Sequence, residues 1–248
     1  MLDSVFHPVF YGSISHGTRC HSFTESRHLE SQFPSEMLQH IEQTGVIAVL
    51  ILDDADNAVP LAQALFSGGV QAMELTLRTD AAIESLRRIR MDVPDMLAGI
   101  GTVIREDQVD DVVAAGAQFA VSPGLNPAVV QRARQAGLPF APGVMTPSDI
   151  EAAIQLGCRE LKFFPAEPSG GLPMLNSIRA PYAHLGVRFV PLGGINASNM
   201  NAWLTNPGVF AVGGSWLTPR DVVQEKNWDE ITRRAWEACQ IADAVNES

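Results

Sequence analysis

The sequence predicts an α/β protein, a single (β/α)8 barrel of the TIM class that follows a short N-terminal extension. Three observations support this fold class. Eight short apolar runs, rich in β-branched residues, follow one another along the chain. Amphipathic stretches of helical periodicity separate the runs, and several of these stretches end at a glycine, a common signal for the C-terminus of a helix. The 248 residues also suit the length of such a barrel.

The expected strands occupy the chain from residue 45 to residue 216. They cover residues 45–52, 72–78, 97–103, 119–124, 139–144, 160–166, 188–194 and 209–216. Helical stretches such as 54–69 and 105–117 lie between them, and four of the helices end near Gly68, Gly116, Gly137 and Gly157. Alternating strands and helices predict a parallel sheet. In a closed barrel the active site lies at the C-terminal ends of the strands, so the residues there are the first functional candidates.

A doubly wound open sheet is the alternative arrangement of the same units. It would carry a glycine-rich phosphate-binding turn directly after the first strand. Residues 50–57, LILDDADN, contain no glycine. We therefore favour the barrel.

The first 34 residues differ from the rest of the chain. They hold four of the six histidines, many serines and no sustained apolar periodicity, and they lack the basic and apolar segments of a signal peptide. The irregular spacing of these histidines and Cys20 argues against a metal site. We therefore divide the chain into an extension, residues 1–34, expected to be poorly ordered, and a barrel domain, residues 35–248. Removal of the extension should leave fold and activity intact.

The composition excludes several classes of partner. The formal net charge is -11 and no dense run of Lys and Arg is present, which argues against nucleic acid or an anionic membrane. No apolar run approaches the ~20 residues that a membrane-spanning helix needs. Cys20, Cys158 and Cys239 lie far apart without CxxC spacing, which indicates reduced thiols in the cytoplasm. We expect a small-molecule substrate, and neither a metal nor a cofactor.

Lysine is almost absent from this chain. Of the 17 basic residues only Lys162 and Lys226 are lysines, and Lys162 lies within the apolar run ELKFFPA. A guanidinium stays protonated, whereas a buried ammonium can lose its proton and become a nucleophile. The lysine at position 162 therefore indicates that this position needs an amine.

The second expected strand has one wholly polar face. Alternate residues of a strand point to opposite faces, so MELTLRT divides into an apolar face and a polar face of Glu74, Thr76 and Arg78. Branched apolar side chains normally fill a barrel interior, so these three polar groups point to function. The same alternation turns Lys162 and Phe164 inward from the sixth strand.

Two explanations fit an inward Lys162. The structural explanation is a buried salt bridge with Glu74, which costs desolvation and is weak evidence for stability. The functional explanation makes Lys162 an imine-forming nucleophile and Glu74 its proton shuttle. The histidines favour the second explanation. Outside the extension only His40 and His184 remain, away from the strand ends, so acid–base chemistry falls to a carboxylate.

Two glycine pairs end the last two expected strands. PLGGIN contains Gly193 and Gly194, and AVGGSWL contains Gly213, Gly214 and Ser215. Loops at these two positions commonly bind phosphate in barrels, largely through backbone N–H groups. Such a site needs no basic side chain, which suits an acidic protein.

Seven motifs, in order along the chain, resemble those of the 2-keto-3-deoxy-6-phosphogluconate (KDPG) and 4-hydroxy-2-oxoglutarate (KHG) aldolase family. They are ELTLRT, GIGTV, AQFAVSPG, PFAPGVMTPSD, LKFFPAE, GGIN and GGSWL, and the resemblance extends from about Gly45 to Leu217. It implies a cofactor-free class I aldolase on a (β/α)8 barrel, typically a homotrimer. Such an enzyme cleaves KDPG to pyruvate and glyceraldehyde 3-phosphate in the Entner–Doudoroff pathway, and KHG to pyruvate and glyoxylate.

The resemblance also implies a role for each matching residue. Lys162 would form the Schiff base and Glu74 would be the acid–base residue. The remaining matches would bind substrate: Arg78 and Thr102 the pyruvate carboxylate, Pro123 and Phe164 as pocket walls, and Gly193, Gly194, Gly214 and Ser215 the phosphate.

Leu192 departs from the family pattern, because KDPG aldolases usually have threonine before the GG pair. This leaves the preferred stereochemistry at C4 open, with a C4-epimer (phosphogalactonate-type) aldolase as one alternative. A phosphate-binding barrel isomerase or decarboxylase is a second alternative, and a barrel retained as a binding subunit is a third. Neither of these last two would need an inward lysine beside Glu74.

Overall fold

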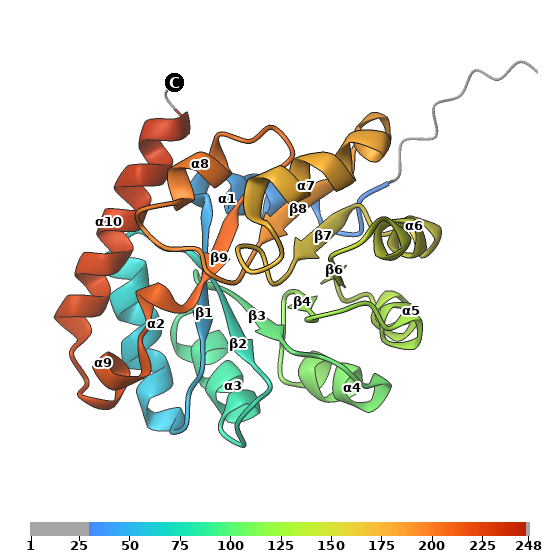
Figure 1. The fold of residues 1–248 in the computed structure, drawn as a ribbon. Helices are drawn as coiled ribbons and strands as arrows, with labels where there is room; N and C mark the ends of the chain where they lie inside the picture. Colours follow the sequence, from blue (N-terminus) through green and yellow to red (C-terminus); the bar gives the residue numbers. More distant parts are fainter. Residues whose placement is uncertain (1–29, 247–248) are drawn as a thin grey trace, which may run out of the picture.

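The computed structural model describes residues 30–246 (Figure 1). Every expected run contains a strand, and the run at 139–144 contains two, separated by Pro142. The strands are β1 (Val46–Leu50), β2 (Ala72–Thr76), β3 (Leu97–Gly101), β4 (Ala120–Val121), β5 (Phe140–Ala141), β6 (Gly143–Val144), β7 (Glu160–Phe163), β8 (Arg188–Pro191) and β9 (Val212–Gly214).

Helices connect the strands, as the sequence periodicity predicted. The α-helices are α1 (Ser35–Thr44), α2 (Ala58–Ser67), α3 (Ala82–Asp92), α4 (Glu106–Ala114), α5 (Pro127–Gln135), α6 (Pro147–Gln155), α7 (Gly171–Arg179), α8 (Met200–Leu204), α9 (Arg220–Gln224) and α10 (Trp228–Asn246). Three short 3-10 helices are η1 (Ala55–Asn57), η2 (Ala180–Leu185) and η3 (Ser215–Leu217). Within the described part of the chain, no helix combines the length and apolar character that crossing a bilayer requires.

The strands form two parallel sheets. One has six strands in the order β5-β4-β3-β2-β1-β9, and the other has three in the order β6-β7-β8. Successive strands are neighbours, and β9 pairs with β1. A doubly wound sheet instead reverses its strand order at a switch point. The observed order therefore excludes that alternative and confirms an α/β protein with a curled parallel sheet.

The two sheets meet at both edges. β5 and β6 belong to one stretch of chain that Pro142 divides, and a proline cannot donate a ladder hydrogen bond. At the other edge, isolated parallel bridges link Phe189 to Val209 and Leu192 to Gly213.

The described residues form two separate apolar cores, which agrees with the alternation of side-chain direction predicted for β2 and β7. Met73 and Leu75 of β2 lie, with Leu161 and Phe163 of β7, in the larger core, which also contains helix residues. Ala72 lies in a smaller core with inward residues of other strands. Phe119 fills space in this inner core beside Gly99, where a Cβ atom would lie 2.5 Å from the phenyl ring.

Within the described residues, packing of the N-terminal segment on the rest of the chain begins at residue 31, before the boundary expected at residue 34. Phe33 is 6% exposed and belongs to the inner core with α1 residues. The Ser31 hydroxyl donates to Glu160 Oε2 at 2.8 Å, and Gln32 Nε2 donates to the Gly157 carbonyl at 3.2 Å. The packed region therefore includes residues on the extension side of the boundary expected at residue 34. The rest of that extension, residues 1–29, lies outside the described residues.

Candidate active site

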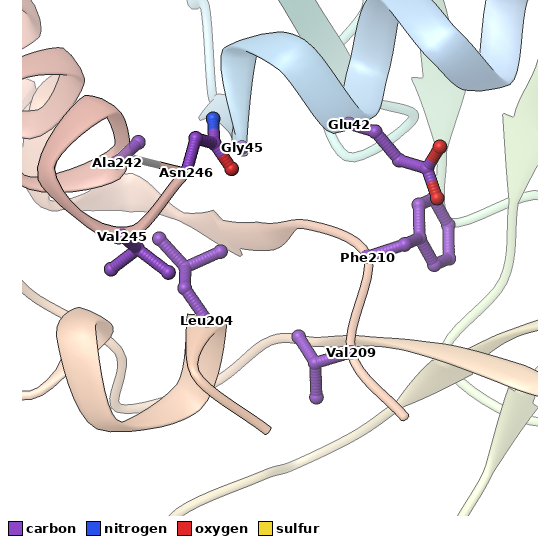
Figure 2. A pocket seen from close by; sticks show the side chains of 8 residues that line it. All are labelled: Glu42, Gly45, Leu204, Val209, Phe210, Ala242, Val245 and Asn246. Carbon is purple, nitrogen blue, oxygen red and sulfur yellow. The ribbon is translucent and has the colours of Figure 1, made fainter. Parts of the chain in front are cut away.

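Two cavities lie at opposite ends of the strands. The first has a volume of about 210 Å3 and lies beside Gly45, just before β1, and Val209 and Phe210, just before β9 (Figure 2). Glu42 is the only charged residue that lines it, and its carboxylate pairs with Arg188. This cavity at the N-terminal ends of the strands therefore holds no group suited to nucleophilic chemistry.

The second cavity has a volume of about 190 Å3 and lies at the C-terminal ends of the strands. Strands from both sheets supply its walls. The lining residues are Val49, Ile51, Glu74, Thr76, Arg78, Thr102, Pro123, Lys162, Phe164, Leu192, Gly193, Gly214 and Ser215. Neither His40 nor His184 is among them, so the acid–base groups that line this cavity are carboxylate and amine.

Lys162 and Glu74 meet inside this second cavity. Lys162 Nζ donates to Glu74 Oε1 at 3.1 Å, and the two side chains are 7% and 2% exposed. A glycine makes the space for the Glu74 carboxyl group, because a Cβ atom on Gly101 would lie 3.0 Å from it. Lys162 pairs across the sheet with Gly143. The phenyl ring of Phe164 lies 5.4 Å from Lys162 Nζ, within cation–π range.

Arg78 and Thr102 flank this pair just beyond the ends of β2 and β3. Arg78 is solvent-exposed at the cavity mouth and forms no ion pair with a carboxylate of residues 30–246. Thr102 has φ of 67°, which is unusual for a β-branched residue. Such strained residues concentrate at functional sites. An unpaired guanidinium beside a buried amine suits a ligand that carries a carboxylate.

The glycine pairs form the opposite wall of the cavity. Gly193 and Gly194 have φ of 97° and 85°, a region that glycine enters without strain. Gly214 lies under the Trp216 ring, where a Cβ atom would come within 2.0 Å of ring carbons. Ser215 follows at the cavity surface. Ten of the eleven residues to which the sequence analysis gave a catalytic, binding or specificity role line this one cavity, and Gly194 lies next to a lining residue.

The sequence reasoning missed four residues around the cavity. Thr76 was recognised as inward but given no role, and it donates to the Leu50 carbonyl at 3.2 Å. Val49 and Ile51 line the cavity from the first strand run, and the alternation rule applied to that run would have identified them. Glu167 contacts the Gly193–Gly194 turn from the loop after β7, and no local pattern indicated that contact.

Cysteine is a poor alternative nucleophile in the described part of the chain. Burial raises the pKa of the Cys158 thiol to about 12, and the carboxylate of Glu160 acts in the same direction. Burial also raises the pKa of the Cys239 thiol to about 11. Thiolates are the reactive form, and neither residue lines the cavity.

Comparison with known proteins identifies the family. The family model described as KDPG and KHG aldolase matches residues 37–234. The chain belongs to the KDPG and KHG aldolase family. The 2-dehydro-3-deoxy-phosphogluconate aldolase of Dickeya dadantii is 43% identical over 199 residues, 80% of this chain and 92% of that protein. Membership confirms the resemblance found in the motifs and makes the chain a member of a lyase family.

Solved structures of KDPG aldolases share the fold. The enzyme of Legionella pneumophila, with pyruvate captured at low pH as a covalent carbinolamine, is 40% identical with a TM-score of 0.77, covering 80% of this chain and 96% of that one. The enzyme of Zymomonas mobilis ZM4 with 3-phosphoglycerate is 37% identical with a TM-score of 0.76, covering 81% and 93%. The aldolase core thus accounts for most of this chain.

Proposed function

We propose that this chain is a class I aldolase that cleaves KDPG to pyruvate and glyceraldehyde 3-phosphate. The observation that carries the proposal is the buried Lys162 amine, 3.1 Å from the Glu74 carboxylate in a cavity at the C-terminal ends of the strands. The carbinolamine of pyruvate in the Legionella relative supports covalent chemistry of this kind.

The reaction begins when the neutral Lys162 amine attacks the C2 ketone of the substrate. The C–N bond forms, the carbinolamine loses water, and a protonated imine results. Glu74 takes the proton of the C4 hydroxyl, the C4 carbonyl forms, and the electrons of the C3–C4 bond flow into the iminium to give an enamine. Glu74 then gives this proton to C3, which regenerates the imine and the carboxylate, and water releases pyruvate and the free amine.

Binding groups at the two ends of the cavity hold the substrate across this centre. Arg78 and Thr102 bind the carboxylate of the pyruvate half, and Phe164 and Pro123 form the walls beside it. At the other end the phosphate lies against the turns that contain Gly193, Gly194, Gly214 and Ser215. Backbone N–H groups bind phosphate there without adding cationic side chains, which fits the net charge of -11.

Leu192 weakens the discrimination between the two configurations at C4. It is 5% exposed and lines the cavity beside Gly213. An apolar wall cannot strongly reject either hydroxyl configuration. The enzyme therefore prefers KDPG, also cleaves its C4 epimer, and cleaves 4-hydroxy-2-oxoglutarate to pyruvate and glyoxylate.

The two sheets form one closed (β/α)8 barrel in this proposal. The continuity of β5 with β6 through Pro142 supports closure at one edge, and the Phe189–Val209 and Leu192–Gly213 bridges support it at the other. Closure would bring inward residues from both sheets into one site, as the cavity lining requires.

The active form is a homotrimer that works in the cytoplasm, within the Entner–Doudoroff pathway. Exposed apolar side chains support association, since Ile104 and Met145 are 49% and 40% exposed. Ile104 also lines a groove of about 260 Å3 with Leu125. Light scattering on the eluted protein should give three times the mass of the chain, and Ile104→Asp should reduce that mass.

A coupled assay tests the catalytic proposal. Cleavage of KDPG is followed through pyruvate with lactate dehydrogenase, in wild type, Lys162→Met and Lys226→Met. We expect turnover in the wild type, loss of about 10³-fold or more in Lys162→Met, and near-normal turnover in Lys226→Met, because Lys226 is exposed and does not line the cavity. A folded Lys162→Met protein that retains turnover would favour an isomerase, a decarboxylase or a binding subunit with contaminating activity.

A further inference from the structure

The loop after β7 is bound directly to the turn after β8. The Ala166 N–H donates to the Leu192 carbonyl at 2.7 Å, and the Glu167 N–H donates to the Gly193 carbonyl at 2.9 Å. The packing is close enough to require glycine. A Cβ atom on Gly194 would lie 2.6 Å from the Glu167 Cβ. The two segments therefore form one packed unit.

The side chain of Glu167 extends this connection to α8. Its Oε1 accepts hydrogen bonds from Trp203 Nε1 at 2.7 Å and from Asn199 Nδ2 at 3.3 Å. Asn199 Nδ2 also donates to the Gly194 carbonyl at 3.0 Å, while its Oδ1 accepts from the Asn196 N–H at 2.8 Å. Trp203 is almost fully buried against Phe163 of β7. Glu167 thus holds the amide that fixes the Gly194 peptide.

These hydrogen bonds determine the direction of two N–H groups. In a planar trans peptide, the carbonyl of one residue and the N–H of the next point in opposite directions. The Gly193 carbonyl is bound by the Glu167 N–H, so the Gly194 N–H points away from Glu167. The Gly194 carbonyl is bound by Asn199, so the Ile195 N–H points away from Asn199. Neither N–H donates a hydrogen bond to another of residues 30–246, so both remain for an anion.

We infer that Glu167 is a positioning residue that fixes the Gly193–Gly194 turn for the substrate phosphate. The inference rests on the proposed function and goes beyond it, because it assigns the preference for phosphorylated substrates to a residue outside the cavity lining. Glu167 touches neither Lys162 nor Glu74, so it takes no part in imine formation. A substrate without phosphate has no group for the turn to hold.

The main comparison uses two substrates in four proteins, and two further variants extend it. KDPG carries the phosphate and 4-hydroxy-2-oxoglutarate does not, and both yield pyruvate for the same coupled assay. The proteins are wild type, Glu167→Ala, Glu167→Gln and Glu151→Ala. Glu151 is a matched control, because it too accepts a hydrogen bond from an aromatic donor, Tyr182 at 2.9 Å, and it does not line the cavity.

We expect Glu167→Ala to raise KM for KDPG about tenfold or more, the effect of losing the acceptor for two hydrogen bonds. The kcat/KM of Glu167→Ala for 4-hydroxy-2-oxoglutarate should stay within about threefold of wild type. The kcat/KM of Glu151→Ala should do so for both substrates. Glu167→Gln keeps the Oε1 acceptor for both donors and should restore KM for KDPG. Asn199→Ala should show the same selective defect, and the double variant should be no worse than the worse single one.

Equal losses on both substrates, or no loss on either, would overturn the inference, because a merely structural role does not distinguish them. The Asn199→Ala and Glu167→Gln proteins carry the test if Glu167→Ala fails to fold. A wild type that cleaves both substrates with equal kcat/KM would overturn the phosphate site itself, and the role of Glu167 with it. A wild type without aldolase activity contradicts the proposed function before any variant is compared.

Discussion

Lys162 and Glu74 lie within hydrogen-bond distance of each other, as both explanations of the sequence required. A buried pair is weak evidence for stability, because the desolvation of two charges can exceed their attraction. What separates the explanations is the surroundings of the pair. It borders a cavity with the unpaired Arg78 at its mouth and the strained Thr102 at its wall. A purely structural ion pair needs none of these features.

Glu74→Gln should separate the two functions of the pair. The variant keeps Lys162 and should still form an imine with pyruvate, but turnover should fall by roughly 10²–10⁴-fold because the proton shuttle is lost. Exchange of the pyruvate methyl protons with deuterium, measured by NMR, should fall in parallel. Near-normal exchange in this variant would mean that another group moves the proton.

Leu192→Thr should sharpen the choice between C4 epimers. A hydroxyl at this position adds one polar partner for a substrate hydroxyl, worth on the order of 1–3 kcal/mol of discrimination. The measurement is kcat/KM for KDPG and for its C4 epimer in both proteins. A wild-type preference above roughly 10³-fold would exceed what an apolar wall delivers, and would mean that another residue recognises the hydroxyl.

At the residue scale, the sequence predicted the residues that strand alternation or a rare residue type distinguishes. The rare Lys162 and the inward Glu74 follow from strand period and composition, and the structure brings them together. Glu167 could not be predicted in this way. Its role depends on a hydrogen bond to Trp203, which lies in α8 and is distant in the sequence, and no local pattern records such a contact.

At the scale of elements, β7 and the residue after it carry three inward side chains, one after another along the direction of the strand. Glu160 lies at the base, Lys162 in the middle, and Phe164 follows the strand at the cavity wall. Glu160 is 1% exposed, and its Oε1 has no hydrogen-bond partner among the described residues. Burial raises the pKa of this carboxyl above its ordinary 4.5, against the opposing effects of the Ser31 hydroxyl, Arg188 and Arg159.

The raised pKa predicts how stability depends on pH. The folded protein holds the Glu160 proton more tightly than the unfolded chain. This contribution is therefore fully present below the unfolded pKa of 4.5 and is lost as pH rises through the higher folded value. The side chain in Glu160→Gln does not titrate, so this variant loses no stability in this way. Its amide oxygen can still accept a hydrogen bond from the Ser31 hydroxyl. Urea midpoints measured from about pH 5 to about pH 8 should show the variant gaining on wild type as pH rises. Parallel curves, or a wild type that gains on the variant, would contradict this.

At the scale of the whole molecule, the sequence predicted the order of eight strand runs and the parallel sheet. The domain boundary expected at residue 34 stays a prediction, although packed contacts begin a few residues before it. Residues 31–33 contain no periodic pattern, yet Phe33 is buried in the inner core. A single aromatic anchor has no repeat to detect, so only the packed structure reveals it.

Two truncations test where the packed region begins. Deletion of residues 1–29 should leave the free energy of unfolding unchanged within about 0.5 kcal/mol. The activity should also be unchanged. Deletion of residues 1–34 also removes Phe33 and the Ser31 contact, and should cost about 3–5 kcal/mol, while the remaining folded protein keeps its kcat because the cavity lies at the other end of the strands. Equal stability of the two truncated proteins in urea would show that Phe33 contributes nothing.

Trapping of the imine tests the central claim most directly. Borohydride is added to the protein with pyruvate, and the peptides are mapped by mass spectrometry. The chain has only two lysines, so the exposed Lys226 serves as an internal control. The account predicts a reduced pyruvyl adduct on Lys162, absent from Lys226 and dependent on pyruvate. No adduct on Lys162, or equal labelling of both lysines, would contradict a Schiff-base mechanism at this site.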